Sequence, residues 1–186
     1  MFIKHLSLAS FRNYKNAEIA LQPGVNLLVG PNGQGKTNLV EAIRYLSTLS
    51  SHRVAGYLPL IKQDEGQAAV RAMASHADRD ILIELELNRD SPNKARVNKS
   101  PVPRVRDILG LVNSVTFAPE DLDIVKRDPT NRRAFIDELV VQVWPRFAGV
   151  YSDYERVLKQ RNTLLKTARQ TGAKGNALST LDAWDQ

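Results

Sequence analysis

The chain has 186 residues, of which 42% are apolar, and 26 Lys and Arg against 20 Asp and Glu leave a formal charge of +6. This length suits one domain or one and a half, and the apolar fraction is large enough for a packed core, which excludes wholesale disorder. The absence of cysteine excludes disulfides and thiolate metal sites and fits the cytoplasm, where we expect the chain. No apolar run approaches the roughly 20 residues of a membrane-spanning helix, so we expect no membrane partner.

The first part of the sequence predicts short strands around one glycine-rich loop. Six runs have the apolar or alternating pattern of strands: 2–11, 17–21, 25–29, 68–74, 80–87 and 112–117. The run 25–29 is short and rich in β-branched and aliphatic residues, which predicts a buried strand. A helix is predicted from residue 36 to 49, with an apolar face of Leu39, Val40, Ile43 and Leu46.

After Pro119 the sequence changes to helical patterns. Asp128 followed by Pro129 is typical of a helix start, with proline at the first helical position. Helices are then predicted over 129–144 and 147–169. We expect an α/β lobe over residues 1–118 and, over residues 119–186, the beginning of a helical lobe that looks cut short.

The glycine-rich loop carries the strongest motif. It reads Gly30, Pro31, Asn32, Gly33, Gln34, Gly35, Lys36 and Thr37, which fits G-x-x-x-x-G-K-[ST]. Glycines let the backbone wind around a phosphate chain, and the helix that follows presents its positive end to the anion. In such loops the lysine reaches the β- and γ-phosphates and the hydroxyl binds Mg²⁺. The motif therefore predicts binding of a nucleoside triphosphate such as ATP, with Lys36 on the phosphates and Thr37 on magnesium.

A complete catalytic set is not visible in the sequence. Hydrolysis needs an acid that holds magnesium and polarises water, usually after a hydrophobic strand. Asp137 and Glu138 follow an apolar pair but lie within the predicted helix, and Glu84 alternates outward on its strand. We assign no catalytic residue.

Three arginines fall on predicted apolar helix faces. Arg132 and Arg133 lie on the apolar side of the first helix, and Arg161 lies in the middle of the apolar side of the second. Arginine on such a face is costly unless paired. Snorkelling near a helix end is an equal alternative for Arg132 and Arg133, whereas a specific buried contact is favoured for Arg161.

Four stretches together resemble the RecF family of bacterial DNA-repair ATPases: residues 11–14, 30–38, 119–137 and 159–166. Their order and spacing agree with that family over essentially the whole chain. RecF proteins are similar to the Rad50 and SMC heads of the ABC class. The resemblance implies an α/β fold: a P-loop NTPase lobe with an antiparallel β subdomain, followed by a helical lobe. It also places Arg12 and Asn13 near the nucleotide phosphates.

The resemblance further implies a function. RecF proteins bind ATP with Mg²⁺, dimerise when ATP is bound and hydrolyse it slowly. They bind DNA at junctions of duplex and single strand and, with RecO and RecR, help to load RecA at gaps during repair and replication restart. Arg132, Arg133 and Arg161 would then couple the two lobes or contact DNA.

The chain departs from the family chiefly in length. The L-S-x-G-Q-like signature and the strand acids after it are absent from these 186 residues. In the ABC class, the signature of one subunit completes the ATP site of the other. We therefore expect this chain to bind nucleotide weakly and not to hydrolyse it at a useful rate. Another SMC-like head, or an inactive DNA- or protein-binding chain with an idle loop, remains the alternative.

Overall fold

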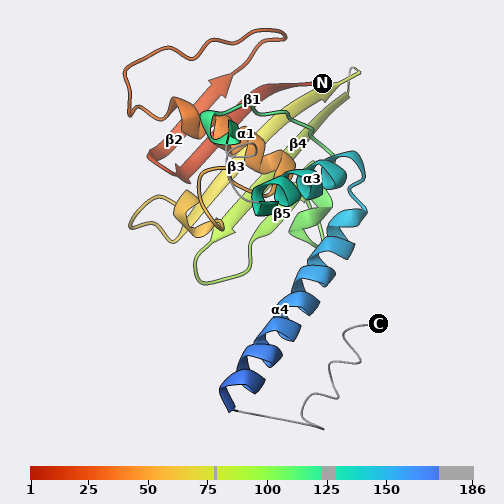
Figure 1. Cartoon of the computed structure of the whole chain (residues 1–186). Helices are drawn as coiled ribbons and strands as arrows, with labels where there is room; N and C mark the ends of the chain where they lie inside the picture. Colours follow the sequence, from red (N-terminus) through yellow and green to blue (C-terminus); the bar gives the residue numbers. More distant parts are fainter. Residues whose placement is uncertain (78, 123–128, 172–186) are drawn as a thin grey trace. The chain divides into compact units, whose positions relative to one another are not determined.

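The computed structural model describes the chain except for residues 78, 123–128 and 172–186. The chain divides into two compact units, one from Met1 to Pro145 and one that begins at Arg146 (Figure 1). The first unit holds the sheet, the glycine-rich loop and two helices, and the second holds one long helix. The boundary predicted from the sequence, between residues 118 and 119, marks where the helical pattern begins. It stays a prediction.

The first unit is built on one antiparallel sheet of six strands in the order β2-β1-β3-β4-β5-β6 (Figure 1). The strands are β1 (Phe2–Phe11), β2 (Tyr14–Ala20), β3 (Gln67–His76), β4 (Arg79–Asn88), β5 (Lys94–Val97) and β6 (Ser100–Pro101). Alternation along β4 sends Ile83, Leu85 and Leu87 into the core. The sheet confirms the predicted antiparallel β subdomain. Strand β1 lies between β2 and β3, so that Leu6 is opposite Ile19 on β2 and Ala72 on β3.

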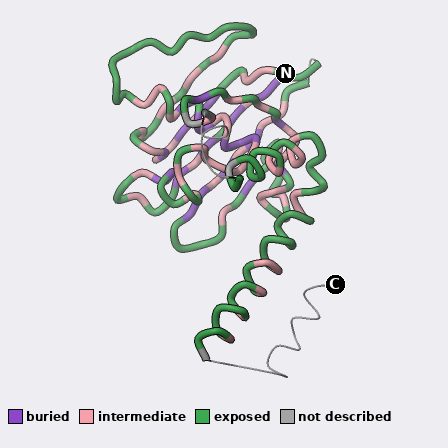
Figure 2. Tube along the Cα trace, in the orientation of Figure 1, coloured by how far each residue is buried: buried purple, intermediate pink, exposed green. Residues whose placement is uncertain are grey.

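Helix α1 (Lys36–Thr48) packs against the inner face of this sheet. Its buried face carries Leu39, Ala42, Tyr45 and Leu46, and the buried stretches of Figure 2 lie mainly along the strands and this helix. The opposite face of the sheet carries ion pairs such as Arg71–Glu84 at 3.2 Å. Such exposed pairs add little stability, so the core between sheet and α1 holds the unit together.

Helix α3 (Pro129–Val143) belongs to the first unit, and helix α4 (Phe147–Thr171) forms the described part of the second. The Arg44 Nη2 on α1 donates to Glu138 on α3 at 2.8 and 3.0 Å, which ties the two helices together. Short 3₁₀ turns are η1 (Leu58–Leu60), η2 (Val105–Ile108) and η3 (Pro119–Leu122). Within the described residues, no helix is both long and apolar enough to cross a bilayer.

Two predicted strands are wrong. Neither 25–29 nor 112–117 forms a strand: Val25 is 96% exposed and Val115 is 99% exposed, and in the second run only Val112 is buried, in an isolated bridge with Leu109. A strand is buried only when other segments pair with it and cover it. No strand of the described chain pairs with either run. The apolar face predicted for α1 is also partly wrong, because Val40 is 40% exposed and Glu41 is buried.

The sequence also missed β5 and β6. These strands are short, and the turn between them uses Asn98 and Lys99 in the left-handed region, with φ of 49° and 70°. Proline at residues 92, 101 and 103 and the polar composition of the segment hide this edge hairpin from a periodicity argument.

Candidate functional site

The glycine-rich loop leads directly into α1 and lies against the turn between β1 and β2. Gly33 and Gly35 adopt φ of 81° and 95°, a region that side chains rarely occupy. A Cβ on Gly35 would lie 2.6 Å from the Asn13 Oδ1 and 2.8 Å from the Tyr14 ring, whereas one on Gly33 would meet nothing within 4 Å. Gly35 is therefore required by close approach of the turn, and Gly33 by backbone conformation alone.

The N-terminus of α1 fits an anion. Gly35 caps the helix without a side-chain hydrogen bond, and the first turn contains no acid. The first N–H groups of a helix have no intrahelical acceptor, and they carry the positive end of its dipole. The start of α1 thus offers uncompensated donors to a phosphate, as the motif predicts.

Lys36 folds back onto the loop, and Thr37 lies at the start of α1. The Lys36 Nζ donates to the carbonyl oxygens of Gly30 and Pro31 at 2.7 and 2.6 Å, which holds the ammonium within the loop. Phosphate oxygens could take over these donors. Thr37 is exposed at the helix start, so its hydroxyl suits a magnesium ion shared with phosphate oxygens. Within the described residues, no group of three or more His, Asp or Glu side chains is placed to hold a metal ion.

The β1–β2 turn places Asn13 at the loop and Arg12 behind it. The Tyr14 hydroxyl donates to the Gln34 carbonyl at 3.3 Å, and the Asn38 Nδ2 donates to the Asn13 Oδ1 at 2.7 Å. Arg12 has a left-handed φ of 54°, held by its N–H bond to the Leu60 carbonyl at 2.7 Å. Strain of this kind persists where the surrounding structure fixes the residue, often at functional sites.

The Arg12 guanidinium pairs with Glu41 of α1. Its Nε and Nη2 donate to the two carboxylate oxygens at 2.8 and 2.6 Å, and the Glu41 side chain is completely buried. Burial alone would raise the pKa of Glu41, but hydrogen bonds from Arg12 and Ser51 and the charges of Arg12 and Arg53 outweigh it, so this pKa lies below its usual value. Glu41 is therefore a buried anion held by two arginines.

A basic pocket of about 720 Å³ opens beside the turn. Among the described residues that line it are the cations Arg12, Arg53, Lys62 and Arg89, and none of these described residues is a carboxylate. The Arg89 Nε is held by the Glu65 carbonyl at 2.7 Å, and the Lys62 Nζ by the Asn13 carbonyl at 3.2 Å. Asn13 and Asn38 also line this pocket, so it adjoins the phosphate loop. The arrangement suits an anionic ligand that extends from the loop.

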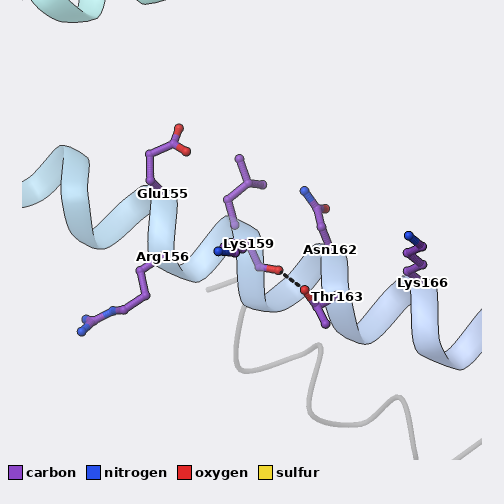
Figure 3. A pocket seen from close by; sticks show the side chains of 7 residues that line it. Glu155, Arg156, Lys159, Asn162, Thr163 and Lys166 are labelled. Atoms are coloured by element: carbon purple, nitrogen blue, oxygen red, sulfur yellow. Dashed lines mark hydrogen bonds between the residues drawn. The ribbon is translucent and has the colours of Figure 1, made fainter. Parts of the chain in front are cut away.

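A second hollow lies on α4 and is a weaker candidate. Figure 3 shows its side chains, among them Arg156, Lys159 and Lys166, and all of them come from this one helix. The hydroxyl of Thr163 is used internally, donating to the Lys159 carbonyl at 2.8 Å. At the phosphate loop, by contrast, the loop, the β1–β2 turn and α1 meet, so we place the site there.

The structure describes all three arginines singled out by sequence. Arg132 and Arg133 are exposed on α3, and Arg161 is half-buried on α4. Sequence reasoning missed Asn38, Glu41, Arg53, Lys62 and Arg89. For Glu41 the sequence offered one signal, because this acidic residue lies among the apolar residues of α1 and so could have been expected to be buried and paired.

Known proteins share this sequence and fold. The model of the RecF/RecN/SMC N terminal domain matches residues 2–174. DNA replication and repair protein RecF of Streptomyces avermitilis is 57% identical over the whole chain, which covers 51% of that protein, and RecF of Frankia alni is 55% identical, with 50% covered.

A solved structure of the recombination mediator protein RecF-ATP in the RecFOR pathway has 34% identity and a TM-score of 0.87 over 99% of this chain and 49% of the other. A structure from work on ATP-driven dimerisation of SMC ATPases has 22% identity and a TM-score of 0.60, covers 75% of this chain and shares the fold. The chain spans about half the length of the curated relatives it matches.

These matches confirm the fold expected from the sequence, a P-loop ATPase lobe of the SMC head type with an antiparallel β subdomain. The chain belongs to the RecF/RecN/SMC N-terminal domain family and corresponds to the N-terminal part of RecF.

Proposed function

We propose that this chain is the ATP-binding part of a RecF-type DNA replication and repair protein. The observation that carries the proposal is the loop 30–37, whose glycines, lysine and uncapped helix N-terminus form a cradle for phosphates. A RecF relative was solved as RecF-ATP, which supports ATP as the ligand. Lys36 would bind the β- and γ-phosphates, and Thr37 would bind Mg²⁺.

ATP would act as a switch in the full-length protein. The γ-phosphate would order the 11–14 turn and the loop together, because Asn13 and Tyr14 already contact the loop. The ordered surface would form part of an ATP-dependent homodimer with slow hydrolysis. Within this chain, Glu84 is paired with Arg71 on the outer sheet face and Asp137 lies on helix α3, so neither suits the catalytic acid. Binding without useful turnover is the expected behaviour.

The proposed cellular role is repair at gaps in DNA. The full-length protein would bind junctions of duplex and single strand and, with RecO and RecR, assist loading of RecA in the bacterial cytoplasm. Arg132, Arg133 and Arg161 would couple the nucleotide state to DNA binding. Replacing Arg161 with Leu in the full-length protein would then remove the effect of ATP on affinity for gapped DNA. Arg156→Gln, which breaks only the exposed pair with Asp153, is the matched control.

Nucleotide titration of the chain tests the core of the proposal. Mg-ATP at 100 times its dissociation constant should stabilise the fold by about 2.7 kcal/mol and raise Tm by roughly 5–10 °C. Lys36→Ala should abolish this shift, whereas Lys15→Ala, an exposed lysine on β2, should keep it. No shift in the wild-type chain would favour a DNA- or protein-binding chain with an idle loop. Phosphate release that disappears in Lys36→Ala would contradict the expected lack of turnover.

A further inference from the structure

Glu41 is a buried carboxylate for which the phosphate-loop motif has no use. It lies five residues after Lys36 on the same helix, and its side chain is 0% exposed. Besides Arg12, it accepts a hydrogen bond from the Ser51 hydroxyl at 2.5 Å, and the Arg53 Nη1 lies 3.7 Å away. A buried charge is costly unless such partners compensate it. Two other segments of the chain, the β1–β2 turn and residues 51–53, therefore converge on this carboxylate.

A chain of polar contacts leads from Glu41 to the phosphate loop. The Arg53 Nη1 that approaches Glu41 also donates to the Asn38 Oδ1 at 2.8 Å. Asn38 then donates through Nδ2 to the Asn13 Oδ1 at 2.7 Å, and Asn13 lies against Gly35. We call these four side chains, Glu41, Arg53, Asn38 and Asn13, the Glu41 relay.

The relay has a defined polarity. A guanidinium can only donate, so Arg53 requires the oxygen of Asn38 to face it. The amide of Asn38 is then left to donate, and it engages the oxygen of Asn13. The remaining donor, the Asn13 Nδ2, is left beside Gly35, where a phosphate held by the loop would need donors.

We infer that Glu41 is a positioning residue for the nucleotide site: through Arg53 and Asn38 it orients Asn13 to donate to a phosphate oxygen, and through Arg12 it holds the β1–β2 turn against the loop. This inference rests on the proposed binding of ATP. It assigns Glu41 no contact with the nucleotide and no part in chemistry.

A second ion pair on α1, between Arg44 and Glu138, supplies a control. Glu138 of α3 accepts from Arg44 of α1 at 2.8 Å, in a pair that is also partly buried. Within the described part of the chain, this pair makes no contact with the loop, the turn or the basic pocket; it ties α1 to α3 and, through Ser50, to the segment just after α1. Glu138→Gln therefore removes a comparable ion pair without touching the relay.

Equilibrium titration with a fluorescent ATP analogue and Mg²⁺ provides the first readout. Glu41→Gln and Asn38→Ala should each weaken binding about tenfold, the size expected for one charge-assisted hydrogen bond. Glu41→Asp, which keeps the charge, should recover most of the affinity. The affinity of Glu138→Gln for the analogue should stay within twofold of wild type, even if this variant lowers Tm as much as Glu41→Gln does. Asn38 is at the surface end of α1, so Asn38→Ala decides the matter if Glu41→Gln does not fold.

NMR relaxation of the Gly33 and Gly35 amides without nucleotide provides the second readout. The relay predicts lower order parameters at these amides in Glu41→Gln and Asn38→Ala than in wild type or Glu138→Gln. Affinities within twofold of wild type in both relay variants would overturn the inference, as would an equal loss in Glu138→Gln. If the wild-type chain binds no ATP, the proposed function fails, and the order parameters alone then support or overturn the positioning of the loop.

Discussion

Gly35→Ala tests the close approach between the phosphate loop and the β1–β2 turn, and Gly33→Ala is its matched control. Both glycines have positive φ, so alanine at either position adds backbone strain of about 1 kcal/mol. Effects on the unfolded chain are the same for the two substitutions. Only at position 35 does the new Cβ meet other atoms, at 2.6 Å from the Asn13 Oδ1 and 2.8 Å from the Tyr14 ring.

The difference between the two variants measures that contact. To admit a methyl group at position 35, Asn13 must move and lose its hydrogen bond from Asn38, which contributes about 1 kcal/mol. We expect Gly35→Ala to lower the free energy of unfolding by about 2–3 kcal/mol and Gly33→Ala by about 1 kcal/mol. Urea unfolding followed by circular dichroism measures both.

A double variant sharpens the test. Asn13→Ala removes the side chain that the new methyl group at position 35 would meet first. Asn13→Ala should therefore destabilise the Gly35→Ala variant less than it destabilises the wild type. Tyr14 remains close, so recovery should be partial. Equal losses in Gly35→Ala and Gly33→Ala, with no coupling to Asn13, would refute the reasoning that the turn is packed on the loop.

Three further predictions follow from burial. Leu85→Ala in the sheet core should lower the free energy of unfolding by about 2–5 kcal/mol, whereas Leu27→Ala, at a position that is 83% exposed, should change it by less than about 0.5 kcal/mol in the same urea titration. Burial raises the pKa of Tyr45 to about 12 from 10.0, so stability should fall between pH 10 and 12 by at most about 1.4 kcal/mol per pH unit, and Tyr45→Phe should remove that share of the fall. Because the pKa of Glu41 is lowered, the ionised carboxylate stabilises the fold above pH 4.5, and this stabilisation is lost as the pH falls. The difference in unfolding free energy between wild type and Glu41→Gln should therefore be largest near neutral pH and smaller in acid. A difference that does not vary with pH would contradict this.

Local sequence determined the parts of the protein whose structure depends on neighbours along the chain. The G-x-x-x-x-G-K-[ST] motif places a positively charged helix start after a glycine loop, and the structure begins α1 at Lys36 as predicted. Alternation of apolar residues predicts β4, and proline at the first position predicts the start of α3 at Pro129. These signals act over a few residues, so one sequence is enough to show them.

Tertiary structure alone decided which groups meet. Val25 to Val29 have the composition of a buried strand, yet they lie exposed because burial requires partner strands, and no described segment pairs with them. The fold also pairs Arg12 with Glu41, a residue 29 positions away, a contact that the sequence did not indicate. Contacts of this kind depend on how β1 and α1 are packed, and neither residue's neighbours in sequence carry that information.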